Sequence, residues 1–111
     1  MTRRSKYGNV KVEADGYTFD SKMEYRRYQE LKLLQQARKL YDLKVHPFWP
    51  INVNGVPNVC KVVADFEYFL GTYRKQVVED VKGKDNALSK LKRKLLKAAH
   101  GIDIILIKKV S

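Results

Sequence analysis

The chain is organised around Gln76-Val77-Val78-Glu79-Asp80-Val81-Lys82-Gly83-Lys84, a run rich in β-branched residues that stops at a glycine. Such residues favour strands, so the run predicts a β-strand. Side chains two positions apart on a strand project from the same face. Asp80 and Lys82 are therefore expected to point together. The opposite face is expected to carry Val77, Glu79 and Val81.

An acid and a lysine on one face of a strand have a functional and a structural interpretation. A carboxylate can hold Mg²⁺ through its oxygens, and a neighbouring lysine can orient an attacking water or neutralise charge at a phosphate. The pair would then suit a metal-dependent phosphodiesterase. The alternative is a solvated or cross-strand ion pair. The pattern Asp-x-Lys also occurs at Asp20/Lys22 and Asp42/Lys44, but only Asp80 lies within a sustained strand-like run.

Length and composition predict one domain with a polyanionic partner. The 111 residues are 44% hydrophobic, which suits a single domain over residues 1–111 with a modest core. No stretch approaches the run of about 18 apolar residues that a membrane span needs. The net charge is +11, from 23 Lys and Arg against 12 Asp and Glu. That excess favours nucleic acid, although ribosome-associated and membrane-surface proteins share it.

The N-terminal segment and the single cysteine bear on the compartment. Residues 1–8 contain Arg3 and Arg4 and lead into no apolar segment of the kind that a signal peptide needs. We expect a basic arm that is flexible unless it lies on phosphate; the alternative is an ordinary frayed terminus. Cys60 has no cysteine partner, which favours a reducing cytoplasm, and its apolar surroundings predict a buried structural thiol.

The remaining patterns predict a mixed order of strands and helices. Asp15-Gly16 marks the turn of an N-terminal hairpin. Gly71-Thr72 joins the longest expected strand to the Asp80 strand as an antiparallel hairpin. After a second helix, a last apolar strand could run parallel to an earlier one. The expected elements span residues 10–19 (hairpin), 21–38 (helix), 43–53 (edge strand with two prolines), 59–69 and 73–82 (strands), 85–99 (helix) and 102–107 (strand).

Glu24 opens the first expected helix. Ser21 is expected as the N-cap, and Glu24, three residues on, completes a capping box. Glu24 also shares one helix face with Tyr28 and Leu31, which predicts that its carboxylate points inward. An inward carboxylate at a helix start either caps the helix or joins a polar site, and both roles stay open.

Asp65 and His46 are candidates of unequal strength. Asp65 interrupts an apolar run, where burying a carboxylate is costly unless it is paired or holds a metal. This pattern makes Asp65 a functional candidate. His46 precedes Pro47 in an aromatic stretch, which is more typical of a packing or surface residue than of a ligand or a base.

The second expected helix carries a basic face. Its apolar residues Leu88, Leu91 and Leu95 are expected to point inward. The basic residues have no acid within the helix to offset them, so contact with phosphates is favoured over plain solvation. They are Lys90, Lys92, Arg93, Lys94 and Lys97. The predicted DNA-binding residues of the whole chain are Arg3, Arg4, Lys84, Lys90, Arg93, Lys94 and Lys97.

Together these features resemble the PD-(D/E)xK nuclease superfamily over about residues 17 to 109. The inward Glu24, Asp65 within its apolar run and Asp80-Val81-Lys82 carry the resemblance. It implies a restriction-endonuclease-like αβββαβ core, a mixed central sheet flanked by helices, with an N-terminal β-hairpin beside it. It also implies cleavage of DNA phosphodiesters with Mg²⁺ or Mn²⁺, using one or two ions. Ala64 departs from the motif, which often has proline before its first acid.

The resemblance assigns a role to each motif residue. Asp65 and Asp80 would hold the metal ion together with the carbonyl of Val81. Glu24 would complete the site directly or through a water molecule. Lys82 would orient the nucleophilic water.

More narrowly, the sequence resembles small phage and prophage proteins related to Holliday junction resolvases. This implies structure-selective cleavage of branched DNA in recombination, replication or packaging, in the host cytoplasm and without a membrane. A homodimer would match the two symmetric strands of a junction. The alternative is a non-catalytic basic DNA-binding or regulatory module, in which the acids are structural.

Overall fold

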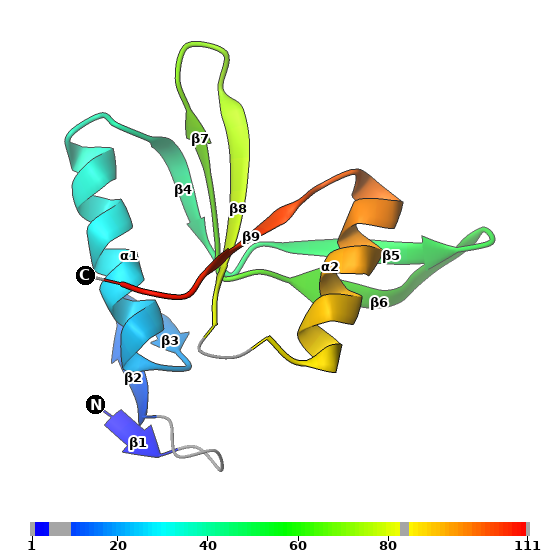
Figure 1. The fold of residues 1–111 in the computed structure, drawn as a ribbon, viewed down its shortest axis with the longest axis horizontal. Helices are drawn as coiled ribbons and strands as arrows, with labels where there is room; N and C mark the ends of the chain where they lie inside the picture. Colours follow the sequence, from blue (N-terminus) through cyan, green and yellow to red (C-terminus); the bar gives the residue numbers. More distant parts are fainter. Residues whose placement is uncertain (1, 5–9, 83–84, 111) are drawn as a thin grey trace.

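The computed structural model describes residues 2–4, 10–82 and 85–110, which form a mixed α/β fold with two helices (Figure 1). The expected fold class is confirmed at that level. The elements are β1 (Thr2–Arg4), β2 (Val10–Ala14), β3 (Tyr17–Phe19), α1 (Lys22–Gln36), β4 (Tyr41–Val45), β5 (Phe48–Val53), β6 (Val56–Val63), β7 (Phe66–Leu70), β8 (Lys75–Val81), α2 (Ala87–His100) and β9 (Ile104–Ile107).

The central sheet has the strand order β4-β7-β8-β9. β4 and β8 both pair antiparallel with β7, while β9 runs parallel to β8. The hairpin between β7 and β8 and the parallel last strand are therefore confirmed. Gly71 in this hairpin has φ +72, a conformation that costs glycine nothing and strains other residues.

β8 shows the expected alternation of faces. Val77 packs in the core on the α1 side, and Val78 packs in the core on the α2 side. Glu79 contacts an arginine of α1, whereas Asp80 faces a lysine of α2. The strand therefore sends its two neighbouring carboxylates to opposite sides of the sheet.

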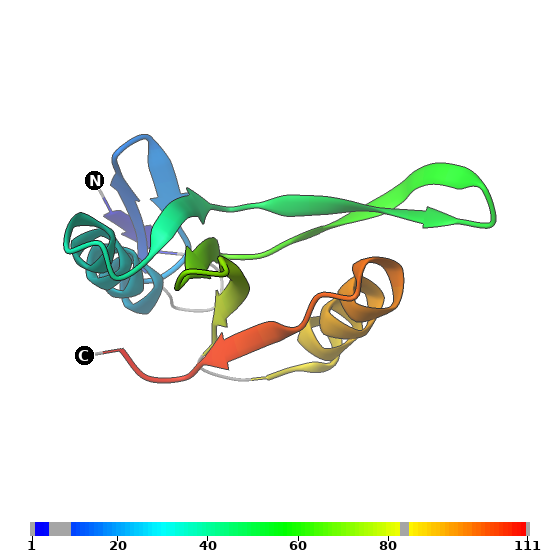
Figure 2. The ribbon, with the colours of Figure 1, turned by 90° about the horizontal axis from the view of Figure 1, so that it is seen from above.

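Two hydrophobic cores flank the sheet, and Figure 2 shows α1 and α2 on either side of β8 and β9. The α1 core is built around Phe19, Leu31 and Phe66, and the α2 core around Ile51 and Leu96. Among the described residues, neither helix combines the length and the apolar character that crossing a bilayer requires.

The N-terminal strands form a small separate sheet beside α1. β2 and β3 make the expected hairpin around Asp15-Gly16, with Ala14 opposite Tyr17. β1 adds to β2 antiparallel, so residues 2–4 of the expected basic arm form a strand. Residues 5–9 lie outside the described part of the chain.

β5 and β6 form a two-stranded antiparallel arm that extends from the sheet past α2 (Figure 2). The sequence predicts an edge strand interrupted by prolines over residues 43–53, and this segment divides at His46-Pro47 into β4 and β5. It predicts one continuous strand over residues 59–69, which is wrong, because that segment divides at Ala64-Asp65 into β6 and β7. Both runs break at one place, where the His46 amide donates to the Asp65 carbonyl at 2.9 Å and the Ala64 amide donates to the Pro47 carbonyl at 2.9 Å. These bonds hold the two segments together where they leave the sheet.

The arm also explains why the expected burial of Cys60 is wrong. Cys60 is exposed. The apolar run around it belongs to a ribbon that packs on the α2 core through Trp49, Ile51 and Val62 and not through Cys60. An apolar strand pattern predicts burial only where another layer covers it, and no such layer of the described chain covers Cys60.

α2 packs along a face that only partly matches the expected one, because Leu95 packs against the core as predicted but Leu88 and Leu91 do not. Leu88 and Leu91 are 74% and 51% exposed, whereas Leu96 is fully buried against the arm. Lys92 and Arg93 are turned partly inward instead, where each pairs with an acid that lies outside the helix. The Lys92–Asp80 pair favours this orientation because a buried acid needs a counter-charge, and Arg93 adds two hydrogen bonds to the partly exposed Asp85.

Candidate functional site

Three potential metal ligands converge where α1, the arm and the central sheet meet. Glu24 lies in the first turn of α1, His46 lies between β4 and β5, and Asp65 lies between β6 and β7. One ligand atom from each residue lies within 4.8 Å of the other two. The arrangement could hold a metal ion.

Glu24 serves both the helix start and this cluster. Its side chain is buried, with Oε1 2.9 Å from His46 Nε2 and Oε2 accepting a hydrogen bond from the Asp20 amide at 3.2 Å. Ser21 Oγ accepts from the Glu24 amide at 3.1 Å, which confirms the N-cap. The capping box is closed one residue earlier than expected, because Glu24 receives the Asp20 amide rather than that of Ser21. Burial raises the pKa of Glu24, and the contact with His46 opposes this shift.

Asp65 is half-buried and tied to the end of β8. Its Oδ2 accepts a hydrogen bond from the Val81 amide at 2.7 Å. Burial raises the pKa of Asp65 to about 7, and the charges of Glu24 and Asp80 add to the effect. The Val81 amide and the charge of Lys82 act in the opposite direction. Four expected site residues thus influence this one carboxyl group.

Asp80 lies beside Asp65 and is fully buried. Its Oδ1 accepts a hydrogen bond from the Asp65 amide at 3.0 Å. The Lys92 ammonium lies 2.8 Å from Oδ2, an ion-pair contact that lacks hydrogen-bond alignment. Oδ2 therefore has no hydrogen-bond partner in the described part of the chain. Asp80 is next to the three-ligand cluster, although the cluster does not include it.

Lys82 and Val81 lie at the end of β8, as the strand pattern predicts. The Lys82 amide donates to the Ile107 carbonyl at 3.0 Å, which anchors this end of the strand to β9. Lys82 directly follows β8, two residues after Asp80. Val81 contributes the amide that holds Asp65.

Glu79, the other acid of β8, belongs to a separate buried network. Arg27 donates to its two oxygens, with Nε at 2.9 Å from Oε1 and Nη2 at 2.6 Å from Oε2. The hydroxyl of Tyr68 also donates to Oε2. The pKa of Arg27 is raised by its hydrogen bonds to Glu79. Because this carboxylate is satisfied by its partners, it is a structural group.

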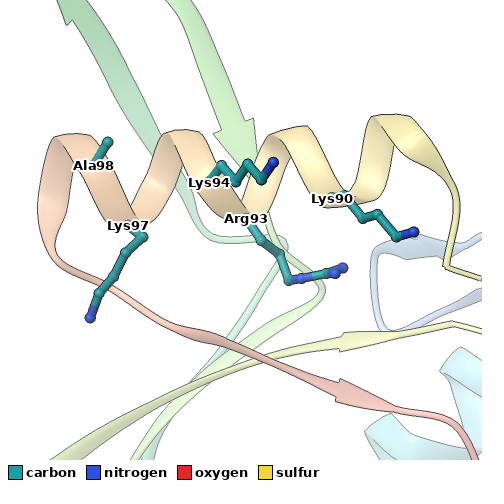
Figure 3. Close-up of a pocket in the computed structure, with 5 residues that line it drawn as sticks. All are labelled: Lys90, Arg93, Lys94, Lys97 and Ala98. Atoms are coloured by element: carbon teal, nitrogen blue, oxygen red, sulfur yellow. The ribbon is translucent and has the colours of Figure 1, made fainter.

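The basic residues of α2 divide into paired and unpaired side chains. Arg93 donates to both oxygens of Asp85 at 2.7 Å, which lowers the pKa of Asp85 to about 2, and Lys97 lies 3.0 Å from Asp103. No salt bridge among the described residues involves Lys90 or Lys94. Figure 3 shows Lys90, Arg93, Lys94 and Lys97 along the helix with Ala98 at its far end, where together they line a shallow open surface pocket.

The structure describes less of the other predicted DNA-binding residues. Arg3 and Arg4 lie on β1 opposite Lys11 and Val10, and only their backbone is described. Lys84 lies outside the described residues.

His46 and Lys92 are the two site residues that the sequence interpretation assigned elsewhere. His46 reaches Glu24 only because the chain bends between β4 and β5. Lys92 reaches Asp80 only because α2 presents this side chain inward. The sole sequence pattern pointing to His46 is its position immediately before a proline, between two strand-like runs.

The chain belongs to the family described as "Protein of unknown function (DUF1064)", whose family model matches residues 4–107. No curated protein and no solved structure matches the chain. The matched span contains Glu24, His46, Asp65 and Asp80.

Proposed function

We propose that the protein is a metal-dependent DNA endonuclease of the PD-(D/E)xK type, which hydrolyses phosphodiester bonds in branched DNA. The observation that carries the proposal is the cluster of Glu24, His46 and Asp65, with Asp80 bonded to the Asp65 amide beside it, near the end of β8, where Lys82 follows. These acids come from separate parts of the sequence. Charges held together at a cost to stability are typical of functional sites.

The order of elements supports this assignment. With the β5–β6 arm taken as an insertion, α1, β4, β7, β8, α2 and β9 follow one another in the order αβββαβ. This is the order that the resemblance implies. Asp65 at the start of β7 and Asp80 near the end of β8 lie side by side because the two strands pair antiparallel.

The donor atoms suit a divalent cation. Glu24 and Asp65 offer hard carboxylate oxygens, His46 offers a nitrogen, and the buried charge of Asp80 lies beside them. When bound, Mg²⁺ or Mn²⁺ supplies a Lewis acid at the phosphate and lowers the pKa of its coordinated water. A bound cation would also favour the charged form of Asp65, whose pKa burial raises to about 7.

The chain's own residues would do the rest of the work. Lys82 orients the attacking water and neutralises charge that develops on the phosphoryl oxygens. The Val81 amide fixes the direction of the Asp65 carboxylate. Lys90 and Lys94 on the exposed face of α2 meet DNA phosphates, in accord with a net charge of +11.

The test is cleavage of labelled four-way junction, fork, flap, duplex and single-stranded DNA in the presence of Mg²⁺ or Mn²⁺. We expect cleavage of branched DNA by the wild type and its loss in Asp65→Asn. Asp103→Asn is the matched control, because that exposed acid pairs with the exposed Lys97 and is not part of the cluster. DNA binding without cleavage of any substrate would favour the alternative of a non-catalytic DNA-binding module.

A further inference from the structure

We infer that His46 is a metal ligand and that the site therefore binds Mn²⁺, and first-row transition ions generally, in preference to Mg²⁺. The inference deepens the proposed function by naming the class of metal. Only the role of the metal in DNA cleavage rests on that proposal, because metal binding can be measured without DNA.

The backbone around His46 directs its ring toward Glu24. His46 has φ 54, a left-handed conformation that is uncommon for a residue with a side chain. Its amide is held by the Asp65 carbonyl at 2.9 Å. The ring lies 6.3 Å from that of Tyr17 and 6.0 Å from that of Phe19, between centroids. The ring is thus fixed before any ligand arrives.

The spacing of the donor atoms fits one ion. His46 Nε2 and Glu24 Oε1 lie 2.9 Å apart. Two adjacent ligands with bonds of about 2.1 Å are separated by roughly 3 Å at a right angle, and opposite ligands by roughly 4.2 Å. The three donor atoms lie within 4.8 Å of one another, so a movement of under about 1 Å would bring the set into range. His46 would then give its Nε2 lone pair to the ion in place of the contact with Glu24.

A buried carboxylate oxygen that lacks a hydrogen bond gives further support. Asp80 Oδ2 is fully buried and has no hydrogen-bond partner in the described ranges, and Asp80 Oδ1 holds the Asp65 amide. Lys92 offsets part of this charge. The remaining negative potential beside Asp65 favours a cation at the adjacent ligands.

The imidazole of His46 determines which cation the site prefers. Mg²⁺ prefers oxygen ligands and keeps several waters, whereas nitrogen ligands suit Mn²⁺, Co²⁺ and Zn²⁺ increasingly well. A site of two carboxylates alone would discriminate weakly between Mg²⁺ and Mn²⁺. The single imidazole nitrogen is therefore the group that sets the preference.

The experiment titrates the metal-free protein with Mn²⁺ alone and with Mg²⁺ alone by calorimetry, and records pulsed electron paramagnetic resonance of the Mn²⁺ form. We expect tighter binding of Mn²⁺ and coupling to a ¹⁴N nucleus of imidazole. His46→Phe keeps an aromatic ring beside Tyr17 and Phe19 but has no donor. It should lose the coupling and at least about tenfold in Mn²⁺ affinity, with a much smaller change for Mg²⁺.

His100→Asn is the matched control, because His100 is the only other histidine and bonds the Pro50 carbonyl far along the chain. It should keep both the coupling and the affinity. Mn²⁺ binding to the wild type without nitrogen coupling, or coupling that survives His46→Phe, would overturn the inference and leave the proposed nuclease intact. Nitrogen-coupled Mn²⁺ binding without DNA cleavage would instead overturn the proposed function and leave the inference standing.

Discussion

At the scale of single residues, Asp65 has the most unusual environment in the site. Burial, Glu24 and Asp80 raise its pKa to about 7, whereas an aspartate in an unfolded chain titrates near 3.9. The folded protein therefore binds the extra proton between about pH 4 and pH 7. Stability should fall as the pH rises through this window, because the folded state has to give up a proton that it holds more tightly.

Replacing Asp65 by Asn removes this titration and keeps an oxygen for the Val81 amide. Without metal, Asp65→Asn should be more stable than the wild type at pH 8, by on the order of 1 to 2 kcal/mol after allowance for solvent screening. The difference should shrink toward pH 4. Urea unfolding in a chelator at both ends of the window measures it. A difference that does not change with pH would contradict the assigned environment.

A comparison of Glu24 with His46 shows which parts of the candidate site local sequence patterns can predict. Glu24 could be placed facing inward because helix periodicity and a serine N-cap are local properties, and the structure confirms both. The partnership of His46 with Glu24 spans 22 positions and depends on a left-handed bend. No local pattern encodes it. The site could therefore be located from its acids, but the nitrogen donor could not.

At the scale of elements, α2 connects the basic surface to the buried acids. Lys92 lies 2.8 Å from Asp80, whose side chain is fully buried. Removing one partner of a buried ion pair leaves an uncompensated charge and costs roughly 3 to 5 kcal/mol. We expect Lys92→Met to lower the free energy of unfolding by an amount near the lower figure, since Lys92 is itself partly exposed.

The control for this prediction is the double variant Lys92→Met/Asp80→Asn. It also removes the unpaired negative charge of Asp80 and should recover much of the lost free energy of unfolding. Lys94→Met, on the exposed face of the same helix, should change stability by less than about 0.5 kcal/mol. Denaturant unfolding of the four proteins completes the comparison. Equal stabilities of Lys92→Met and Lys94→Met would show that the ion pair contributes nothing.

The exposed face of α2 is expected to contact DNA phosphates. Lys94→Ala should weaken binding equally across DNA sequences and lower the slope of log affinity against log salt by about 0.9, the value for one lost phosphate contact. Lys75 is an exposed lysine at the far end of the β7–β8 hairpin, so Lys75→Ala serves as the control. An unaltered slope for Lys94→Ala would indicate that this face of α2 is solvated and does not contact DNA phosphates.

Helix boundaries could be predicted because capping residues mark them. Strand boundaries were less predictable because they depend on the strand with which each segment pairs. Ser21 begins α1 as expected, because a cap is a local feature, and Gly101 ends α2 just after the expected range of 85–99. The division of residues 43–53 and 59–69 arises because both segments leave the sheet together at Pro47 and Ala64. Apolar alternation reports a strand but not the sheet to which it belongs.

At the scale of the whole molecule, the β5–β6 arm stands out as an exposed apolar surface with little charge. The chain has a net charge of +11, yet the β5–β6 arm carries a single charged residue, Lys61. Its exposed apolar side chains are Phe48, Val53, Val56, Val59 and Val63. Monomeric proteins rarely expose large apolar patches, and Figure 1 shows the arm projecting beyond α2.

We expect this arm to join two copies of the chain in the homodimer that branched DNA favours. An isologous contact lets the same apolar face cover itself, and a stable interface needs about 800 Å² from each partner. Sedimentation equilibrium over a range of concentrations should show a dimer for the wild type. The double variant Val56→Lys/Val59→Lys should be monomeric, because four ammonium groups would meet across the two-fold axis. Leu70→Lys, at an exposed apolar position of β7, should remain dimeric.

The outcomes of this last experiment separate the arm from the site. If the double variant is monomeric but still binds Mn²⁺ with the affinity of the wild type, the arm is an assembly element and the metal site is complete within one copy. Loss of paired cuts in a four-way junction, with single cuts retained, would then follow from the loss of the second subunit. A wild type that stays monomeric at every concentration would exclude the arm as a dimer contact, and a double variant that remains dimeric would place the contact elsewhere.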